Sequence, residues 1–274
     1  MSFYRGIGII RYSAMEIDRD AYLSRISVVP GVNFVPSRDS LELLQIRHLE
    51  TVPFENLDIH WKPPIILDTN RFYEKIVVGK RGGFCYELNG LFEMLLRSLG
   101  FGTRLVSARP YSKENGFGPE FDHAAIIVSL GDTEYLVDVG FGDFAAGPLK
   151  IAVGEEQTDR EGTFRINELE NGALVVEKRR GDGWRPEYMF GMQGRNLAEF
   201  SEMCDFQQYS PDSHFTKGKI CSVLTTNGRK TLTDRSYIVT TNCDRVETPV
   251  HSEAEFNEIL MREFGIRQNE EISI

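Results

Sequence analysis

Three side chains suited to covalent chemistry stand far apart in this 274-residue chain: Cys85, His123 and Asp138. Cys85 follows Gly82 and Gly83 in RGGFCYELNGLF, and these glycines allow an unusual turn into a helix that begins near the cysteine. Backbone N–H groups and the positive end of the helix dipole favour the thiolate, the nucleophilic form, at that position. The pattern indicates a cysteine nucleophile, although a small buried residue at a helix start would look the same locally.

Segment 122–143 predicts a β-hairpin that brings His123 and Asp138 together. A two-residue loop at Gly131-Asp132 places Asp138 diagonal to His123 on one face of the sheet, within reach of a hydrogen bond. A three-residue loop would place the two residues on opposite faces. A lone histidine in a strand is usually a surface or satisfied core residue. Asp138, however, lies in the apolar run YLVDVGF, where a carboxylate is costly without a partner.

A further ion pair is expected beside the cysteine turn. Glu55 lies in the largely apolar VPFENLDIH, and Arg81 precedes Cys85 by four residues. A buried Glu55–Arg81 pair would orient this turn without necessarily stabilising the protein. Exposure of both side chains is the alternative.

Helices and strands must position these residues, and the period of the hydrophobic pattern changes along the chain from helical to strand-like. The expected helices span 20–28, 40–50, 85–99, 196–206 and 252–265, the third ending in a left-handed cap at Gly100. From about residue 104 a period of two predicts strands in 102–111, 123–130, 133–141, 163–169, 173–180, 221–232 and 236–242, with turns at Gly131-Asp132, Asn171-Gly172 and Asn227-Gly228. Several short antiparallel strands indicate a small barrel or curled sheet.

Composition excludes several classes of function. The net charge of −10 argues against non-specific nucleic-acid binding, which needs clustered Lys and Arg. A transmembrane helix needs about 18 consecutive apolar residues, and no such run occurs. The apolar patch at Gly6–Ile10 is too short for a signal peptide. Four cysteines without a CxxC pair or metal-ligand spacing fit a reducing cytosol and predict no metal: Cys85, Cys204, Cys221 and Cys243.

The strings VPFEN, RGGFCYELNGLF, HAAIIV with YLVDVGFG, and SPDSHF resemble successive blocks of the arylamine N-acetyltransferases. They occur in that family's order, and the similarity runs from about Tyr22 to Ile266. The resemblance implies an α+β fold in three parts, the first two sharing a core arrangement with papain-like and transglutaminase-like enzymes. These parts are a helical bundle over 1–104 with the nucleophile, an antiparallel β-barrel over 105–206 with His123 and Asp138, and an α/β lid over 207–274.

The same resemblance implies a chemistry. Cys85 would accept an acetyl group from acetyl-CoA, with His123 as base and Asp138 as its orienter. The acetyl-Cys85 intermediate would then acylate an arylamine, arylhydrazine or arylhydroxylamine in a ping-pong mechanism. A cytoplasmic role in xenobiotic metabolism is the corresponding expectation.

The resemblance also implies residues that contact the substrates, although the motifs around these residues are less specific. The aromatic pocket would be lined by Phe54, Tyr86 and Phe141, and bound coenzyme A would lie near Gly140, Phe141, Gly142, His214 and Phe215. All of these are also compatible with ordinary core or turn positions. Asp122, next to His123, is expected to point to the other face of the strand, and its effect on the acceptor is open. The roughly 17 residues before Asp18 match nothing in the family.

Three other interpretations use the same residues differently. A cysteine hydrolase, amidase or amide synthase would employ the same Cys-His-Asp triad, but SPDSHF and the C-terminal lid favour a coenzyme A acyltransferase. A non-catalytic binding module has no need to keep the three residues together. A dinucleotide site at Gly140-x-Gly142-x-x-Ala145 is rejected because GPLKIAVG, and not a helix, follows it.

Overall fold

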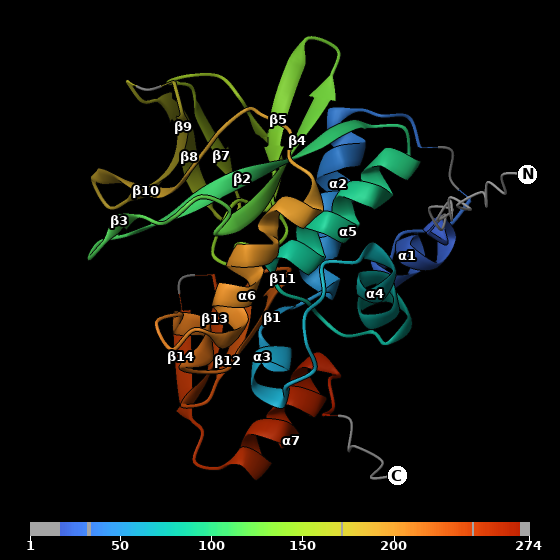
Figure 1. Cartoon of the computed structure of the whole chain (residues 1–274), viewed down its shortest axis with the longest axis vertical. Coiled ribbons are helices and arrows are strands. Elements are labelled where there is room, and N and C mark those ends of the chain that lie inside the picture. Colours follow the sequence, from blue (N-terminus) through green and yellow to red (C-terminus); the bar gives the residue numbers. More distant parts are fainter. Residues whose placement is uncertain (1–16, 32–33, 171, 243, 269–274) are drawn as a thin grey trace, which may run out of the picture.

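The computed structural model describes residues 17–31, 34–170, 172–242 and 244–268. A curled sheet lies at one end of the long axis, a second sheet with one helix at the other, and helices lie beside and between them (Figure 1). The N-terminal extension, Asn171 with its expected turn, and Cys243 fall outside the described residues. Within them, none of the helices has the length and apolarity that crossing a membrane requires.

The N-terminal part is helical, as predicted. Asp18 accepts a hydrogen bond from the Ala21 N–H at 3.0 Å and begins the first helix. The apolar stripe of the fifth helix is fully buried, and Gly100 follows its end with φ +88°. The elements are α1 (Arg19–Arg25), α2 (Arg38–Thr51), α3 (Leu57–Trp61), α4 (Thr69–Tyr73), the π-helical turn η1 (Glu74–Val78) and α5 (Cys85–Ser98).

The central part is an antiparallel sheet in the order β6-β5-β4-β2-β10-β9-β8-β7, with β3 attached to β2. Its strands are β2 (Gly102–Ser112), β3 (Gly116–Phe117), β4 (His123–Leu130), β5 (Thr133–Val137), β6 (Leu149–Lys150), β7 (Glu156–Asp159), β8 (Gly162–Glu168), β9 (Leu174–Arg180) and β10 (Gly183–Phe190). The sheet curls into a nearly closed barrel, because Val153 after β6 bridges to Ile166 of β8. Leu130 pairs with Thr133, which confirms the predicted hairpin register.

The C-terminal part packs helices and a second sheet against the N-terminal helices. The elements are η2 (Leu197–Phe200), α6 (Ser201–Tyr209), η3 (His214–Thr216), β11 (Ile220–Thr225), β12 (Gly228–Thr233), β13 (Ser236–Thr241), β14 (Asp244–Pro249) and α7 (Glu253–Phe264). The sheet begins with β1 (Phe54–Glu55), which pairs with β11 and thereby joins the first part of the chain to the last. The expected boundaries at 104/105 and 206/207 lie inside β2 and α6.

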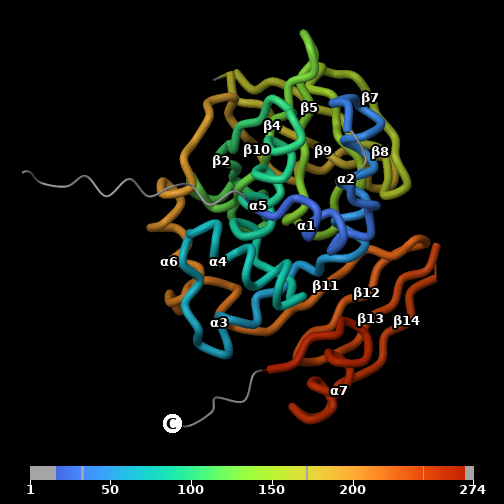
Figure 2. Tube along the Cα trace, turned by 90° about the vertical axis from the view of Figure 1, so that its right-hand side faces the viewer, coloured from blue at the N-terminus to red at the C-terminus, as the bar shows by residue number. Residues whose placement is uncertain are grey.

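The parts pack closely where the chain crosses between them. Helix α2 runs beside β7 and β8 (Figure 2), where Arg160 pairs with Glu50 at 2.9 Å. Helix α5 packs its apolar stripe against α1, α2 and the face of β4 that carries Ile126 and Val128, in one core. The helix that starts at Cys85 is therefore fixed against the strand that starts at His123.

Candidate active site

A cleft of about 720 Å³ opens where the three parts meet, and Cys85 and His123 both line it. Phe54 contributes from β1, Phe141 from the segment after β5, and Phe215 from η3. The cleft thus combines a thiol, an imidazole and aromatic side chains from segments far apart in the sequence.

Cys85 is the first residue of α5, as the glycine pair before it predicted. Gly83 bridges to Phe54 of β1, and the Glu55 N–H donates to the Gly83 carbonyl at 2.9 Å. A Cβ on Gly82 would lie 2.2 Å from the Pro53 carbonyl oxygen. Only glycine fits so close to a neighbouring backbone, which explains the first of the two glycines that precede Phe84 and Cys85.

His123 and Asp138 form the predicted pair. The imidazole Nε2 lies 2.7 Å from Asp138 Oδ2, and both side chains are buried. The rings of Phe141 and Tyr188 pack on the imidazole, with centroids at 5.1 and 5.6 Å. Because Nε2 is bound by the carboxylate, the ring's Nδ1 is left to exchange a proton within the cleft.

Asp138 is in turn held by two donors on its other oxygen. Oδ1 accepts from Asn89 Nδ2 and from the Gly140 N–H, each at 2.9 Å. A Cβ on Gly140 would lie 2.9 Å from the Cys85 Cα, so this loop passes directly against the backbone of Cys85. The carboxylate is therefore fixed to the same helix that carries Cys85.

Sequence reasoning assigned no role to Asn89, one helical turn after Cys85. Its Nδ2 also donates to the Ala124 carbonyl at 2.7 Å, and its Oδ1 accepts the Val139 N–H at 3.0 Å. Asn89 thus joins α5 to the two segments that carry His123 and Asp138. Its i+4 spacing from the cysteine was the available signal, because such residues share a helix face.

The helix start alone does not give Cys85 a low pKa, which corrects the first expectation. Burial raises the pKa of the Cys85 thiol well above its usual value, and the carboxylates of Asp122 and Asp138 act in the same direction. The hydrogen bond from the Tyr86 N–H opposes them but is outweighed. A thiolate at this position therefore requires a neighbouring cation.

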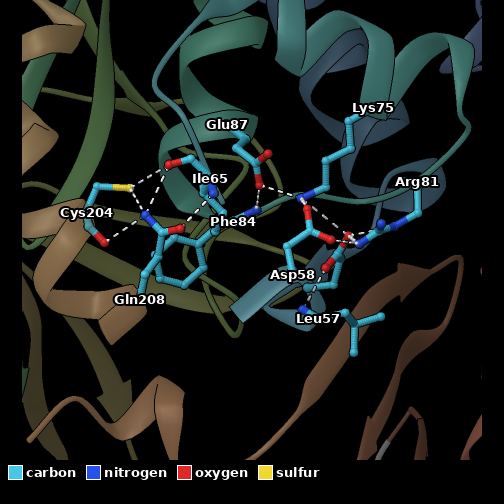
Figure 3. A network of polar contacts seen from close by, with 10 residues as sticks. Leu57, Asp58, Ile65, Lys75, Arg81, Phe84, Glu87, Cys204 and Gln208 are labelled. Carbon is cyan, nitrogen blue, oxygen red and sulfur yellow. Dashed lines mark hydrogen bonds and ion pairs between the residues drawn. The ribbon is translucent and has the colours of Figure 1, made fainter. Parts of the chain in front are cut away.

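A buried network of charges supports the cysteine turn (Figure 3). Arg81 pairs with Glu55 at 2.6 Å, which confirms the expected ion pair, and also with Asp58 at 2.8 Å. On the other side of the network, Lys75 binds Asp58 and Glu87, each at 2.7 Å.

Glu87 connects this network to the turn that carries Cys85. Its carboxylate accepts the Phe84 N–H at 2.8 Å, at the residue before Cys85, while also binding Lys75. Burial raises the pKa of Glu87, and Lys75 opposes that rise. The lysine therefore helps to keep ionised the carboxylate that caps the first turn of α5.

The remaining predicted site residues lie at different depths. Phe54, Gly140, Phe141, Gly142, His214 and Phe215 line the cleft with Cys85. Tyr86 does not: its side chain is fully buried, and its hydroxyl donates to the carbonyls of Phe121 and Asp122 at 3.0 and 3.2 Å. Its observed position is beneath the cleft wall that includes Asp122.

Asp122 faces the cleft, and the expectation that it points to the other side of the strand is wrong. Strand alternation does not reach this residue because β4 begins only at His123, and Phe121 turns the chain with φ +65°. Gln207 of α6 donates its Nε2–H to the Asp122 carboxylate. Burial raises the pKa of this carboxyl, with the Gln207 hydrogen bond and nearby His123 opposing.

Comparison with known proteins agrees with this arrangement. A family model described as N-acetyltransferase matches residues 38–272. The pineal gland arylamine N-acetyltransferase isozyme NAT-3 of Gallus gallus is 33% identical over 275 residues, covering 91% of this chain and 94% of the relative. This chain belongs to the arylamine N-acetyltransferase family.

Solved arylamine N-acetyltransferases confirm the α+β fold. The enzyme from Salmonella typhimurium superimposes with a TM-score of 0.86 at 27% identity, covering 93% of each chain. The Mycobacterium marinum enzyme, in complex with CoA, superimposes with a TM-score of 0.83 at 27% identity, covering 91% of this chain and 93% of the other. Among the described residues of the present chain, no group of three or more His, Cys, Asp or Glu side chains is arranged so that it could hold a metal ion.

Proposed function

We propose that this enzyme transfers an acetyl group from acetyl-CoA to the nitrogen of an arylamine or arylhydrazine, or to an arylhydroxylamine, through an acetyl-Cys85 intermediate. The observation that carries the proposal is a single cleft lined by both Cys85 and His123, with the His123 Nε2 bound by Asp138 at 2.7 Å. Membership of the N-acetyltransferase family supports the acetyl donor.

In the first half-reaction, the Cys85 thiol gives its proton to His123 and the thiolate attacks the carbonyl carbon of acetyl-CoA. The carbon–sulfur bond to coenzyme A then breaks, and the departing thiolate takes the proton from the imidazolium. Asp138 stabilises the imidazolium and fixes the ring tautomer throughout. One thioester replaces another, so this step is nearly balanced and readily reversed by added coenzyme A.

In the second half-reaction, the acceptor nitrogen attacks the acetyl-Cys85 carbonyl and loses a proton to His123. The bond to the Cys85 sulfur breaks as the amide forms, and the thiolate–imidazolium pair is restored. For efficient transfer the amine must outcompete water by about 10³-fold, or roughly 4 kcal/mol of activation free energy. Intrinsic nucleophilicity and positioning of the amine in the cleft are sufficient in size to supply this difference.

The aromatic residues of the cleft fit a planar acceptor. We assign Phe54 and Phe141 to direct contact with the acceptor ring, because both line the cleft and pack near Cys85 or His123. Tyr86 supports this wall from beneath. We place the coenzyme A chain near Gly140, Gly142, His214 and Phe215, because these residues line the same cleft as Cys85.

The cellular setting follows from the same chemistry. Cys85, Cys204 and Cys221 are free thiols, and a cysteine nucleophile requires a compartment that keeps it reduced. We therefore propose a cytoplasmic enzyme, in which acetylation of foreign aromatic amines is the corresponding role.

Steady-state kinetics test the mechanism. We expect parallel double-reciprocal lines when acetyl-CoA is varied at several fixed concentrations of an arylhydrazine, and exchange of labelled coenzyme A into acetyl-CoA without any amine. Intersecting lines without amine-independent exchange would show direct transfer in a ternary complex. Release of coenzyme A and acetate at a rate unaffected by the amine would identify a hydrolase.

A further inference from the structure

Three of the described residues that line the active-site cleft carry carboxylates: Asp122, Asp143 and Asp212. Asp143 is neutralised by Lys178 at 2.7 Å and Arg180 at 3.0 Å. Asp212 is exposed, so water screens its charge. Asp122 is partly buried, and its carboxylate accepts a hydrogen bond from the neutral amide of Gln207. It is the carboxylate of this cleft whose charge is least compensated.

Asp122 also stands at the reacting end of the cleft. It immediately precedes His123, and its charge is among those that raise the pKa of the Cys85 thiol. Any acceptor whose nitrogen attacks acetyl-Cys85 must therefore place its ring within the field of this carboxylate. At low effective dielectric such a field is strong over several ångströms.

The carboxylate is held in place from both sides. Gln207 of α6 donates to it, and Gln207 Oε1 accepts the Ser213 hydroxyl at 2.6 Å. A Cβ on Gly118 would lie 2.6 Å from Asp122 Oδ2, so the other oxygen lies against that glycine. The Tyr86 hydroxyl fixes the Asp122 carbonyl from below. Asp122 is thus a fixed charge in the cleft wall.

We propose that Asp122 determines the charge preference of the enzyme among aromatic acceptors, favouring rings with a cationic or N–H-donating substituent and disfavouring anionic rings. The inference rests on the proposed acetyl transfer. For a substituent within about 8 Å of the carboxylate, at the effective dielectric of a partly buried site, each unit of charge changes the transfer rate about tenfold.

The test uses three anilines of one shape with para carboxylate, carboxamide or amidinium groups. The enzyme is first charged with acetyl-CoA and the acetyl adduct is verified by intact mass. The rate of discharge by each aniline is then measured for wild type, Asp122→Asn and the control Glu120→Gln. Glu120 carries the same charge two residues earlier but does not line the cleft. Each aniline's intrinsic nucleophilicity cancels in the variant-to-wild-type ratio.

Amidinium and carboxylate differ by two units of charge, so we expect Asp122→Asn to lower the preference for amidinium over carboxylate about a hundredfold, with the carboxamide between them. We expect Glu120→Gln to change this preference less than about twofold. The asparagine keeps an oxygen for Gln207, so the wall is preserved. A uniform change across the three anilines, no change, or an equal effect of Glu120→Gln overturns the assignment to Asp122. Failure of the wild-type enzyme to form the acetyl adduct would instead overturn the proposed function.

Discussion

Replacement of Asp138 by asparagine should prevent His123 from acting as a base without changing the shape of the site. Oδ1 of Asp138 accepts two N–H donors, from Asn89 and Gly140. The amide oxygen of the asparagine must occupy that position, so its NH₂ group must face His123. The imidazole Nε2 then becomes an acceptor, and its proton moves to Nδ1, which can no longer take the proton of Cys85.

The size of the loss follows from these contacts. The charge-assisted hydrogen bond is worth about 1.5–3 kcal/mol, and the wrong tautomer adds to its loss. We expect acetylation of Cys85 by acetyl-CoA to slow about 10³- to 10⁴-fold in Asp138→Asn. Rapid quenching with intact-mass detection measures this single turnover, and circular dichroism verifies the fold.

A matched control separates catalysis from structure. Asp159 also accepts backbone N–H groups, from Ala146 at 2.7 Å and Gly147 at 3.2 Å, but it does not line the cleft. We expect Asp159→Asn to acetylate at the wild-type rate. Acetylation of Asp138→Asn at a rate within tenfold of wild type would show that the Asp138 carboxylate is merely structural.

Three further predictions concern stability and reactivity. Burial lowers the pKa of His48 to about 3, so its neutral form stabilises the fold above pH 6.5 and this contribution is lost as pH falls. Urea titrations should therefore show the unfolding free energy of wild type falling between pH 6.5 and 5 by about 2 kcal/mol more than that of His48→Gln. Lys75→Met should lower the unfolding free energy by about 3 kcal/mol, because Asp58 and Glu87 lose their buried cation. Lys113 is exposed, so Lys113→Met should have little effect, and equal effects of the two changes would contradict the role of Lys75 in the charge network. Limiting iodoacetamide at pH 6.5 should label Cys85 before the other cysteines, and peptide mapping that finds another cysteine labelled first, with activity lost in step, would contradict its assignment.

The paired residues of the site were predictable because local rules determine them. Strand alternation and a two-residue loop fix the register of the β4–β5 hairpin, and the pairing of Leu130 with Thr133 leaves little choice for Asp138. The long apolar stripe of α5 likewise fixes its start near Cys85. Asp138 lies in an apolar run, and a carboxylate buried there is costly without a partner, which favoured its pairing with His123.

Other features depend on tertiary contacts that no local pattern contains. Helices α3 and α4 and the turn η1 have five residues each, too few for a period to emerge. Strand β14 is exposed along its length at the sheet edge and shows no alternation. Asn89 acts through three groups distant in the sequence.

The orientation of Asp122 and the pKa of Cys85 also depend on tertiary contacts that no local pattern contains. The first depends on a positive φ at Phe121, which a non-glycine residue seldom adopts and a sequence does not reveal. The second depends on how deeply the thiol is buried. Both outcomes come from packing between segments rather than from the residues beside them.

The central claim is that Cys85 carries the acetyl group. Its most direct test is brief exposure of the enzyme to acetyl-CoA without any amine, followed by intact mass and peptide mapping. We expect one acetyl group on the peptide that contains Cys85, no adduct in Cys85→Ser, and loss of the adduct with formation of N-acetylated product when an arylamine is added. Release of coenzyme A without an adduct, or an adduct on another residue that still supports transfer, would contradict it.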